Sequence, residues 1–259
     1  MGNVRMPVLF IGHGSPMNAI HNNDYTADLK KLAVRLPEPE AVLVISAHWL
    51  TQGTRITSGK NPDQIYDFYG FPDELYTIKY QPPGSPEIAA MISDSVKGLT
   101  IIHDEDRGVD HAAWAVLRHI FPDENVPVLE LSLDMHAGPE DHYKAGKALS
   151  GLRDKGLLIM GSGNIVHNLS VMDYYEGVAP MDWAVEFDER VKKCLVEDNH
   201  TGIIEYEKWG RISKYAVPTD EHYIPMLYAA ALKKDGEKLE FIHESIHHGS
   251  ISMRSFIIN

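Results

Sequence analysis

Pro7-Val8-Leu9-Phe10-Ile11, followed at once by Gly12-His13-Gly14-Ser15-Pro16, is the stretch that decides the fold. Five consecutive apolar residues before a glycine-flanked turn are typical of a strand that is buried on both faces of a parallel sheet. Residues 41–45, 126–133 and 157–160 repeat this apolar pattern. Segments of amphipathic period lie between these runs, so the pattern predicts an α/β fold with a mostly parallel central sheet flanked by helices.

The predicted helices cover residues 24–36, 86–97, 111–120, 140–155, 181–197 and 220–233. Near the C-terminus, residues 239–247 and 251–257 alternate apolar and polar side chains on either side of Gly249-Ser250, which predicts an antiparallel edge hairpin. Residues 57–85 form a long irregular region rich in Pro, Gly and Tyr, and a loop of that length is usually functional. No internal repeat divides the chain, so residues 1–259 are predicted to form one domain.

Composition excludes several classes of function. The 24 basic and 37 acidic residues give a net charge of −13, which disfavours nucleic acid and anionic membranes as partners. No run of apolar residues is long enough to span a bilayer, and residues 1–6 lack the features of a signal peptide. Cys194 is the only cysteine, which excludes an intrachain disulfide and a thiolate metal cluster. We therefore expect a cytoplasmic protein, whose oligomeric state the sequence does not determine.

Three of the fourteen histidines follow apolar runs. His13 follows residues 7–11, His48 follows residues 41–45 within Ser46-Ala47-His48-Trp49, and His167 follows residues 157–160 across a Gly-Ser-Gly-Asn turn. In open α/β sheets, ligands bind beyond the carboxyl ends of the strands. A single histidine in such a place is usually a hydrogen-bonded turn residue. Three at successive strand ends predict a shared polar site, and histidine is the commonest metal ligand.

Two further histidines lie at the predicted starts of helices, His111 in the helix over 111–120 and His222 in the helix over 220–233. Each, taken alone, is more often a surface residue near a helix cap. The long loop also carries four aromatic residues that either wall a substrate pocket or pack the loop onto the domain. They are Tyr66, Phe68, Tyr69 and Phe71.

Six segments, taken in order, resemble one known family. They are Gly12-His13-Gly14-Ser15-Pro16-Met17, Ser46-Ala47-His48-Trp49, Asp110-His111-Ala112-Ala113-Trp114, the segment from Gly161 to Leu169, Glu221-His222-Tyr223-Ile224-Pro225 and the segment from Ser250 to Phe256. The pattern is similar to the DOPA-dioxygenase-like branch of the class III (LigB-type) extradiol ring-opening dioxygenases, and it covers nearly the whole chain.

The resemblance implies one divalent metal ion, Fe(II) for ring cleavage and often Zn(II) in the protein as isolated. His13, His48 and His222 match the three metal ligands. In the better-known branch of the superfamily the third ligand is a glutamate, and here Glu221 lies beside His222. Three histidines with open positions are also a zinc-site pattern, which makes zinc occupancy more plausible.

The resemblance also implies roles for the two other histidines. His167 matches the acid/base histidine and is a possible fourth ligand, whereas His111 matches a histidine that faces the substrate. The implied reaction is 4,5-cleavage of a small catechol such as DOPA by dioxygen, which yields a semialdehyde. Two alternatives remain, a zinc hydrolase on the same scaffold and a non-catalytic Memo-like binding protein. Retention of each candidate acid/base histidine favours catalysis.

Overall fold

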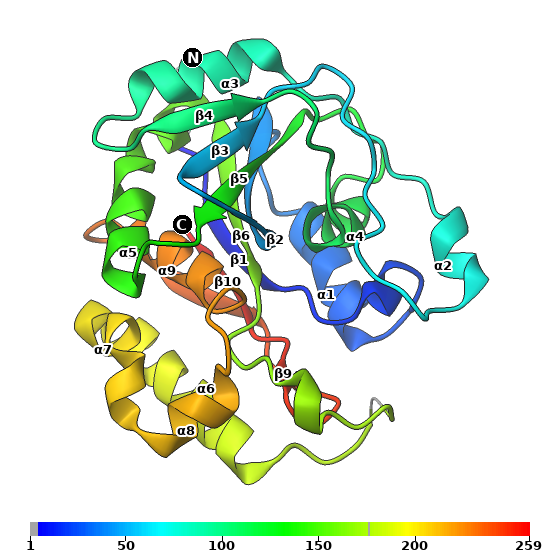
Figure 1. Cartoon of the computed structure of the whole chain (residues 1–259), viewed down its shortest axis with the longest axis vertical. Coiled ribbons are helices and arrows are strands. Elements are labelled where there is room, and N and C mark those ends of the chain that lie inside the picture. The colour runs from blue at the N-terminus through cyan, green and yellow to red at the C-terminus, as the bar shows by residue number, and fades with distance from the viewer. Residues whose placement is uncertain (1–4, 176) are drawn as a thin grey trace.

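An eight-stranded sheet crosses the molecule in the order β4-β3-β5-β2-β6-β1-β10-β7 (Figure 1). This computed structural model describes residues 5–175 and 177–259. The expectation about a signal peptide rests in part on residues 1–4, which lie outside the described residues. The strands of the sheet are β1 Val8–Gly12, β2 Ala41–Thr51, β3 Thr54–Thr57, β4 Ile101–Asp104, β5 Val128–Asp134, β6 Leu157–Gly163, β7 Leu239–His243 and β10 Ser255–Ile258.

The four central strands, β5, β2, β6 and β1, are parallel, which confirms the predicted sheet. On one side, β10 is antiparallel to β1 and β7 is antiparallel to β10, so the antiparallel C-terminal edge is also confirmed. The tip of this hairpin forms a separate two-stranded sheet of β8 Ile246–His247 and β9 Ile251–Ser252. On the other side, β3 and β4 extend the sheet where no strand was expected.

The apolar runs are continuous because each central strand faces a hydrophobic core on both sides. Val8 and Phe10 of β1 point into one core, while Leu9 and Ile11 point into the other. Helices α6 to α9 contribute to the first core, and α1 and α4 to the second. Figure 1 shows α1 and α4 on one side of the sheet and α5 and α9 on the other.

The observed helices match most of the expected ones. They are α1 Asp24–Ala33, α2 Asp73–Thr77, α3 Pro86–Ser95, α4 His111–Ile120, α5 Pro139–Ala148, α6 Asp182–Val196, α7 His200–Ile204, α8 Arg211–Ala216 and α9 Ile224–Ala231. The predicted helix over 140–155 is instead α5 followed by a 3-10 segment, Ser150–Lys155. No helix among residues 5–175 and 177–259 is long and apolar enough to cross a membrane.

The last predicted helix starts later than expected. Residues 218–223 form bends and turns, and α9 begins at Ile224 with Pro225 in its first turn. Proline is favoured there because it fixes a helical φ and lacks the N–H that the first turn leaves unpaired. His222 therefore precedes the helix, and the expectation that it lies in the first helical turn was wrong.

Glycines of β6 let this turn lie directly against the sheet. A Cβ on Gly163 would lie 2.1 Å from the carbonyl oxygen of His222, and a Cβ on Gly161 would lie 2.3 Å from that of Pro225. The backbone N–H of Asn164 donates to the same His222 oxygen at 2.8 Å. Only glycine leaves room for this approach, so the Gly-Ser-Gly sequence fixes where the chain around His222 lies.

We predict that Gly161→Ala destabilises the fold by about 1–3 kcal/mol, as overpacking of a core does. The added methyl group meets backbone oxygen, which cannot move aside as a flexible side chain can. Thermal unfolding measures the loss, since each kcal/mol lowers Tm by about 2–4 °C in a domain of this size. Gly151→Ala is the matched control, because a Cβ there meets nothing within 4 Å. Equal melting temperatures for the two variants would contradict the prediction.

Candidate metal centre

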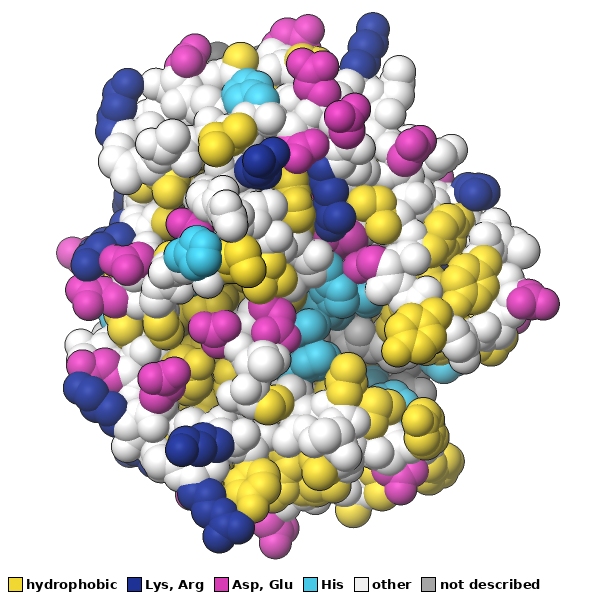
Figure 2. All heavy atoms as spheres, viewed as in Figure 1, with side chains coloured by type: hydrophobic (Ala, Val, Ile, Leu, Met, Phe, Trp, Pro, Cys, Tyr) yellow, Lys and Arg dark blue, Asp and Glu magenta, His cyan; other side chains and the backbone are white. Residues whose placement is uncertain are grey.

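Three of the expected histidines converge at the carboxyl end of the parallel strands. Nε2 of His48 lies 3.3 Å from Nε2 of His13 and 3.2 Å from Nε2 of His222. His13 follows β1, His222 lies in the turn before α9, and His48 lies within β2, which continues past the predicted strand end after a break in register. His13 and His222 are buried and His48 is half-buried. Histidine side chains gather in a hollow on this face (Figure 2).

Hydrogen bonds on the far side of the His13 ring fix its protonation. Nδ1 of His13 lies 3.1 Å from the hydroxyl oxygen of Ser162, which donates its own hydrogen to the carbonyl of Ala112 at 2.6 Å. Because that hydrogen is already used, the Ser162 oxygen accepts from His13. The His13 proton is thus on Nδ1, and Nε2 presents its lone pair to the cluster.

Carboxylates fix the protonation of the His48 and His222 rings in the same way. Nδ1 of His48 lies 2.9 Å from Oδ2 of Asp67, and Nδ1 of His222 lies 2.9 Å from Oε1 of Glu221. An ionised carboxylate only accepts hydrogen bonds, so both histidines carry their proton on Nδ1. Glu221, the alternative ligand, contacts the outer nitrogen of His222 instead.

The spacing of the three rings fits one metal ion. Imidazoles bound at about 2.0–2.1 Å with tetrahedral angles have their nitrogens about 3.3 Å apart and their ring centres about 5.2 Å apart. The Nε2 separations of 3.2 and 3.3 Å agree with that geometry. The ring centres of His13, His48 and His222 lie 5.1, 5.4 and 5.0 Å apart, which also agrees. The three residues therefore fit the divalent metal that their motifs imply.

His167 joins the cluster in a different way. Its ring stacks on that of His222 with centres 3.5 Å apart and planes at 9°. This separation is too short for two ligands of one ion, whose ring centres lie about 4.5 Å apart even at right angles. The backbone of His167 is fixed by its N–H, which donates to Ala216, and by a bridge to Ile251 of β9. The geometry therefore favours a His167 ring that lies beside the metal position and does not bind the ion.

His111 also reaches the cluster, from the first residue of α4. Its ring is edge-on to that of His48 with centres 4.3 Å apart, and its Nδ1 lies 2.8 Å from Oδ1 of Asp67. Sequence reasoning missed Asp67, whose one signal was its position in the long loop between two aromatic residues. The structure thus brings together each of the five expected histidines and adds a carboxylate that contacts two of them.

Burial controls the protonation of most of these rings. It lowers the pKa of His13 and His222 well below the ordinary value, and the charge of His48 lowers both further. Burial, followed by the charge of His222, lowers the pKa of His167 to about 2. For His48 burial also acts to lower the pKa, but the hydrogen bond to Asp67 and nearby acidic charges outweigh it and raise the value. His13, His222 and His167 are therefore neutral near pH 7.

Most aromatic residues of the long loop pack onto the domain. Tyr66, Phe68 and Phe71 lie against the core that contains α1 and α4, and the ring of Phe68 is edge-on to that of His111. Tyr69, in contrast, is 92% exposed. Packing therefore explains three of the four side chains, and Phe68 is in addition a neighbour of the site.

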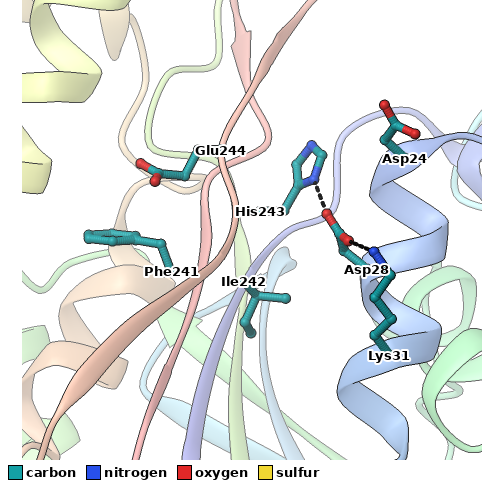
Figure 3. Close-up of a pocket in the computed structure, with 7 residues that line it drawn as sticks. All are labelled: Asp24, Asp28, Lys31, Phe241, Ile242, His243 and Glu244. Atoms are coloured by element: carbon teal, nitrogen blue, oxygen red, sulfur yellow. Dashed lines mark hydrogen bonds and ion pairs between the residues drawn. The ribbon is translucent and has the colours of Figure 1, made fainter.

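A second polar cluster lies between α1 and β7, beside a surface pocket of about 440 Å³ (Figure 3). Asp28 accepts hydrogen bonds from His243 and Lys31, and Nε2 of His243 lies 2.7 Å from the hydroxyl oxygen of Ser245. A serine hydroxyl, a histidine and a carboxylate are joined in the same order in a hydrolytic triad. Ser245 does not line the pocket, however, so a substrate seated there would not meet its hydroxyl. The cluster joins α1 to the edge strand.

Comparisons with known proteins agree with this geometry. A family model described as the catalytic LigB subunit of aromatic ring-opening dioxygenase matches residues 8–256. A protein named 4,5-DOPA dioxygenase extradiol from Escherichia coli (strain K12) is 38% identical over 262 residues, which cover 98% of this chain and 95% of that protein. A protein of the same name from Beta vulgaris is 38% identical over 257 residues, with 95% and 94% covered.

A solved structure shows the same fold. The crystal structure of an uncharacterized protein from Escherichia coli K12 aligns with a TM-score of 0.86 and 35% identity, covering 98% of this chain and 100% of that one. The family match spans nearly the whole chain, and its residues include the three that converge. The chain therefore belongs to the LigB family of class III extradiol aromatic ring-opening dioxygenases, in the branch that contains the 4,5-DOPA dioxygenases.

Proposed function

We propose that this dioxygenase cleaves a small catechol, DOPA or a close relative, at the 4,5 position to a semialdehyde. One divalent metal ion held by His13, His48 and His222 serves the reaction. The observation that carries the proposal is the convergence of three Nε2 atoms, with a hydrogen-bond acceptor beside the opposite nitrogen of each ring. The substrate is inferred from relatives named 4,5-DOPA dioxygenase, two of which are 38% identical to this chain.

The metal that supports turnover is proposed to be Fe(II), with Zn(II) in the protein as isolated. The three-histidine set suits either ion. When bound, Fe(II) supplies the redox chemistry that activates dioxygen, which Zn(II) lacks. His13, His48 and His222 would hold the ion, which when bound would supply the site at which a catechol and dioxygen meet.

His167 is proposed as the acid/base residue. The His167 ring is neutral near pH 7, with its pKa lowered to about 2, and the negative charge that develops on a catechol oxygen raises that pKa, so that the ring accepts the proton and later returns it. Among the hydrogen bonds found for residues 5–175 and 177–259, none involves a ring nitrogen of His167, so neither nitrogen is held by a protein partner. His111, held by Asp67, is proposed to hydrogen-bond to a substrate oxygen.

The same three-histidine geometry suits a zinc hydrolase, since zinc-bound water is a good nucleophile. That function is the second candidate, and oxygen uptake separates it from ring cleavage. A non-catalytic binding protein would give neither oxygen uptake nor hydrolysis.

We predict that His13→Ala abolishes metal retention, because two histidines leave the ion without its third protein ligand. Metal analysis after dialysis should give one equivalent for the parent protein and almost none for the variant. His48→Ala and His222→Ala should behave alike. His136→Ala is the control, since His136 is exposed and lies outside the cluster. Full retention in His13→Ala would contradict the ligand assignment.

His167→Gln is expected to keep its metal and to lose about 10²–10⁴ in kcat, the usual contribution of general acid–base catalysis. Glutamine has similar reach but cannot take up a proton at neutral pH. Metal content and kcat measured on the same preparation separate the two effects. If the variant loses its metal instead, His167 is a ligand and the proposed role is wrong.

The Fe(II)-loaded protein is predicted to consume oxygen with DOPA and to form a yellow, ring-opened semialdehyde. A panel of catechol, protocatechuate, caffeate and DOPA, followed by oxygen electrode and absorbance, ranks the substrates. The Zn(II)-loaded protein is the control and should take up no oxygen. An absence of oxygen uptake with each catechol, in protein shown to contain Fe(II), would favour the hydrolase or the binding protein.

A further inference from the structure

One carboxylate joins two histidines of the site. Oδ2 of Asp67 lies 2.9 Å from Nδ1 of His48, and Oδ1 lies 2.8 Å from Nδ1 of His111. The backbone N–H of His111 donates to the same Oδ1 at 3.0 Å. His48 is on β2 and His111 is on α4, so a single side chain from the long loop connects two separate elements of the fold.

The loop holds this carboxylate in a fixed place. The indole N–H of Trp114 donates to the carbonyl of Ile65 at 2.8 Å, and the backbones of Ile65 and Asp63 both bond to Val109. The residue Asp67 as a whole is exposed, but its side chain is only 19% exposed. Solvent therefore reaches its backbone, while the carboxylate is enclosed between the two rings.

We propose that Asp67 is a positioning residue that sets the tautomers of His48 and His111 together. An acceptor at both Nδ1 atoms places both protons there, which leaves Nε2 of each ring with a free lone pair. For His48 this lone pair faces the metal position. For His111 it makes Nε2 an acceptor toward a hydroxyl hydrogen of the substrate. This inference rests on the proposed function. It means that the side chain that orients a metal ligand also sets the tautomer of the substrate-facing His111.

The chemistry of an amide makes the proposal testable. Asparagine at position 67 has one oxygen that accepts a hydrogen bond and one nitrogen that only donates. It can serve one Nδ1–H, while the other histidine must turn its lone pair to Nδ1 and carry its proton on Nε2. With zinc on Nε2 of His48, that ring keeps its Nδ1 proton and takes the amide oxygen. His111 is then the ring that must change, and its backbone N–H, which bonds to Oδ1 in the parent, loses that acceptor.

Two measurements on Asp67→Asn test this. Zinc titration should give a dissociation constant about 10–100 times higher than that of the parent protein, the usual effect of losing a group that orients a metal ligand. NMR of ¹⁵N-histidine-labelled, zinc-loaded protein should show His111 with its proton on Nδ1 in the parent and on Nε2 in the variant. Asp63→Asn is the matched control, because it removes the same charge from an exposed position on the same loop.

Three results would overturn the proposal. One is a parent protein in which His111 carries its proton on Nε2, a measurement that needs no variant to fold. Another is an Asp67→Asn protein with unchanged tautomers, whatever its zinc affinity, and the third is an equal loss of affinity in Asp63→Asn. None of these readouts uses turnover. Failure of ring cleavage with every catechol would therefore be distinguishable from failure of the role proposed for Asp67.

Discussion

The close approach of three imidazole nitrogens, with Nε2 of His48 within 3.3 Å of Nε2 of both His13 and His222, is the constraint on which the site depends. The lone pairs repel one another unless a positive charge lies between them, either a metal ion or a second proton on His48, whose pKa is raised. The protein keeps them there with three acceptors, Ser162, Asp67 and Glu221, each from a different segment of the chain. The rigid parallel strands and the glycines of β6 position the backbone of the site, and these hydrogen bonds then orient the histidine rings.

Much of the fold could be predicted because the central strands are apolar on both faces. A run such as residues 7–11 has few alternatives to a covered parallel strand, and a histidine directly after it lies at the edge where ligands bind. Strand β3, Thr54–Thr57, has no such run, because it is only four residues long and three of them are polar. The short helices α7 and α8 likewise have too few turns for a clear amphipathic period.

The site was predictable in part for the same reason. His13 and His48 follow strong local patterns, whereas His222 and His111 were assigned roles only through the resemblance to a family. Asp67 had no pattern of its own, since its role comes from contacts with residues 19 and 44 positions away that only the folded chain brings together. Whether His167 binds the metal was open in the sequence, and its parallel stacking on His222 argues against it.

The most direct test of the metal centre is anomalous diffraction from crystals of the metal-loaded protein, recorded at the absorption edge of the bound ion. We expect one strong peak bonded to Nε2 of His13, His48 and His222, with His167 and Glu221 outside bonding distance. A peak bonded to His167 or Glu221, or a metal held elsewhere in the chain, would contradict the three-histidine site.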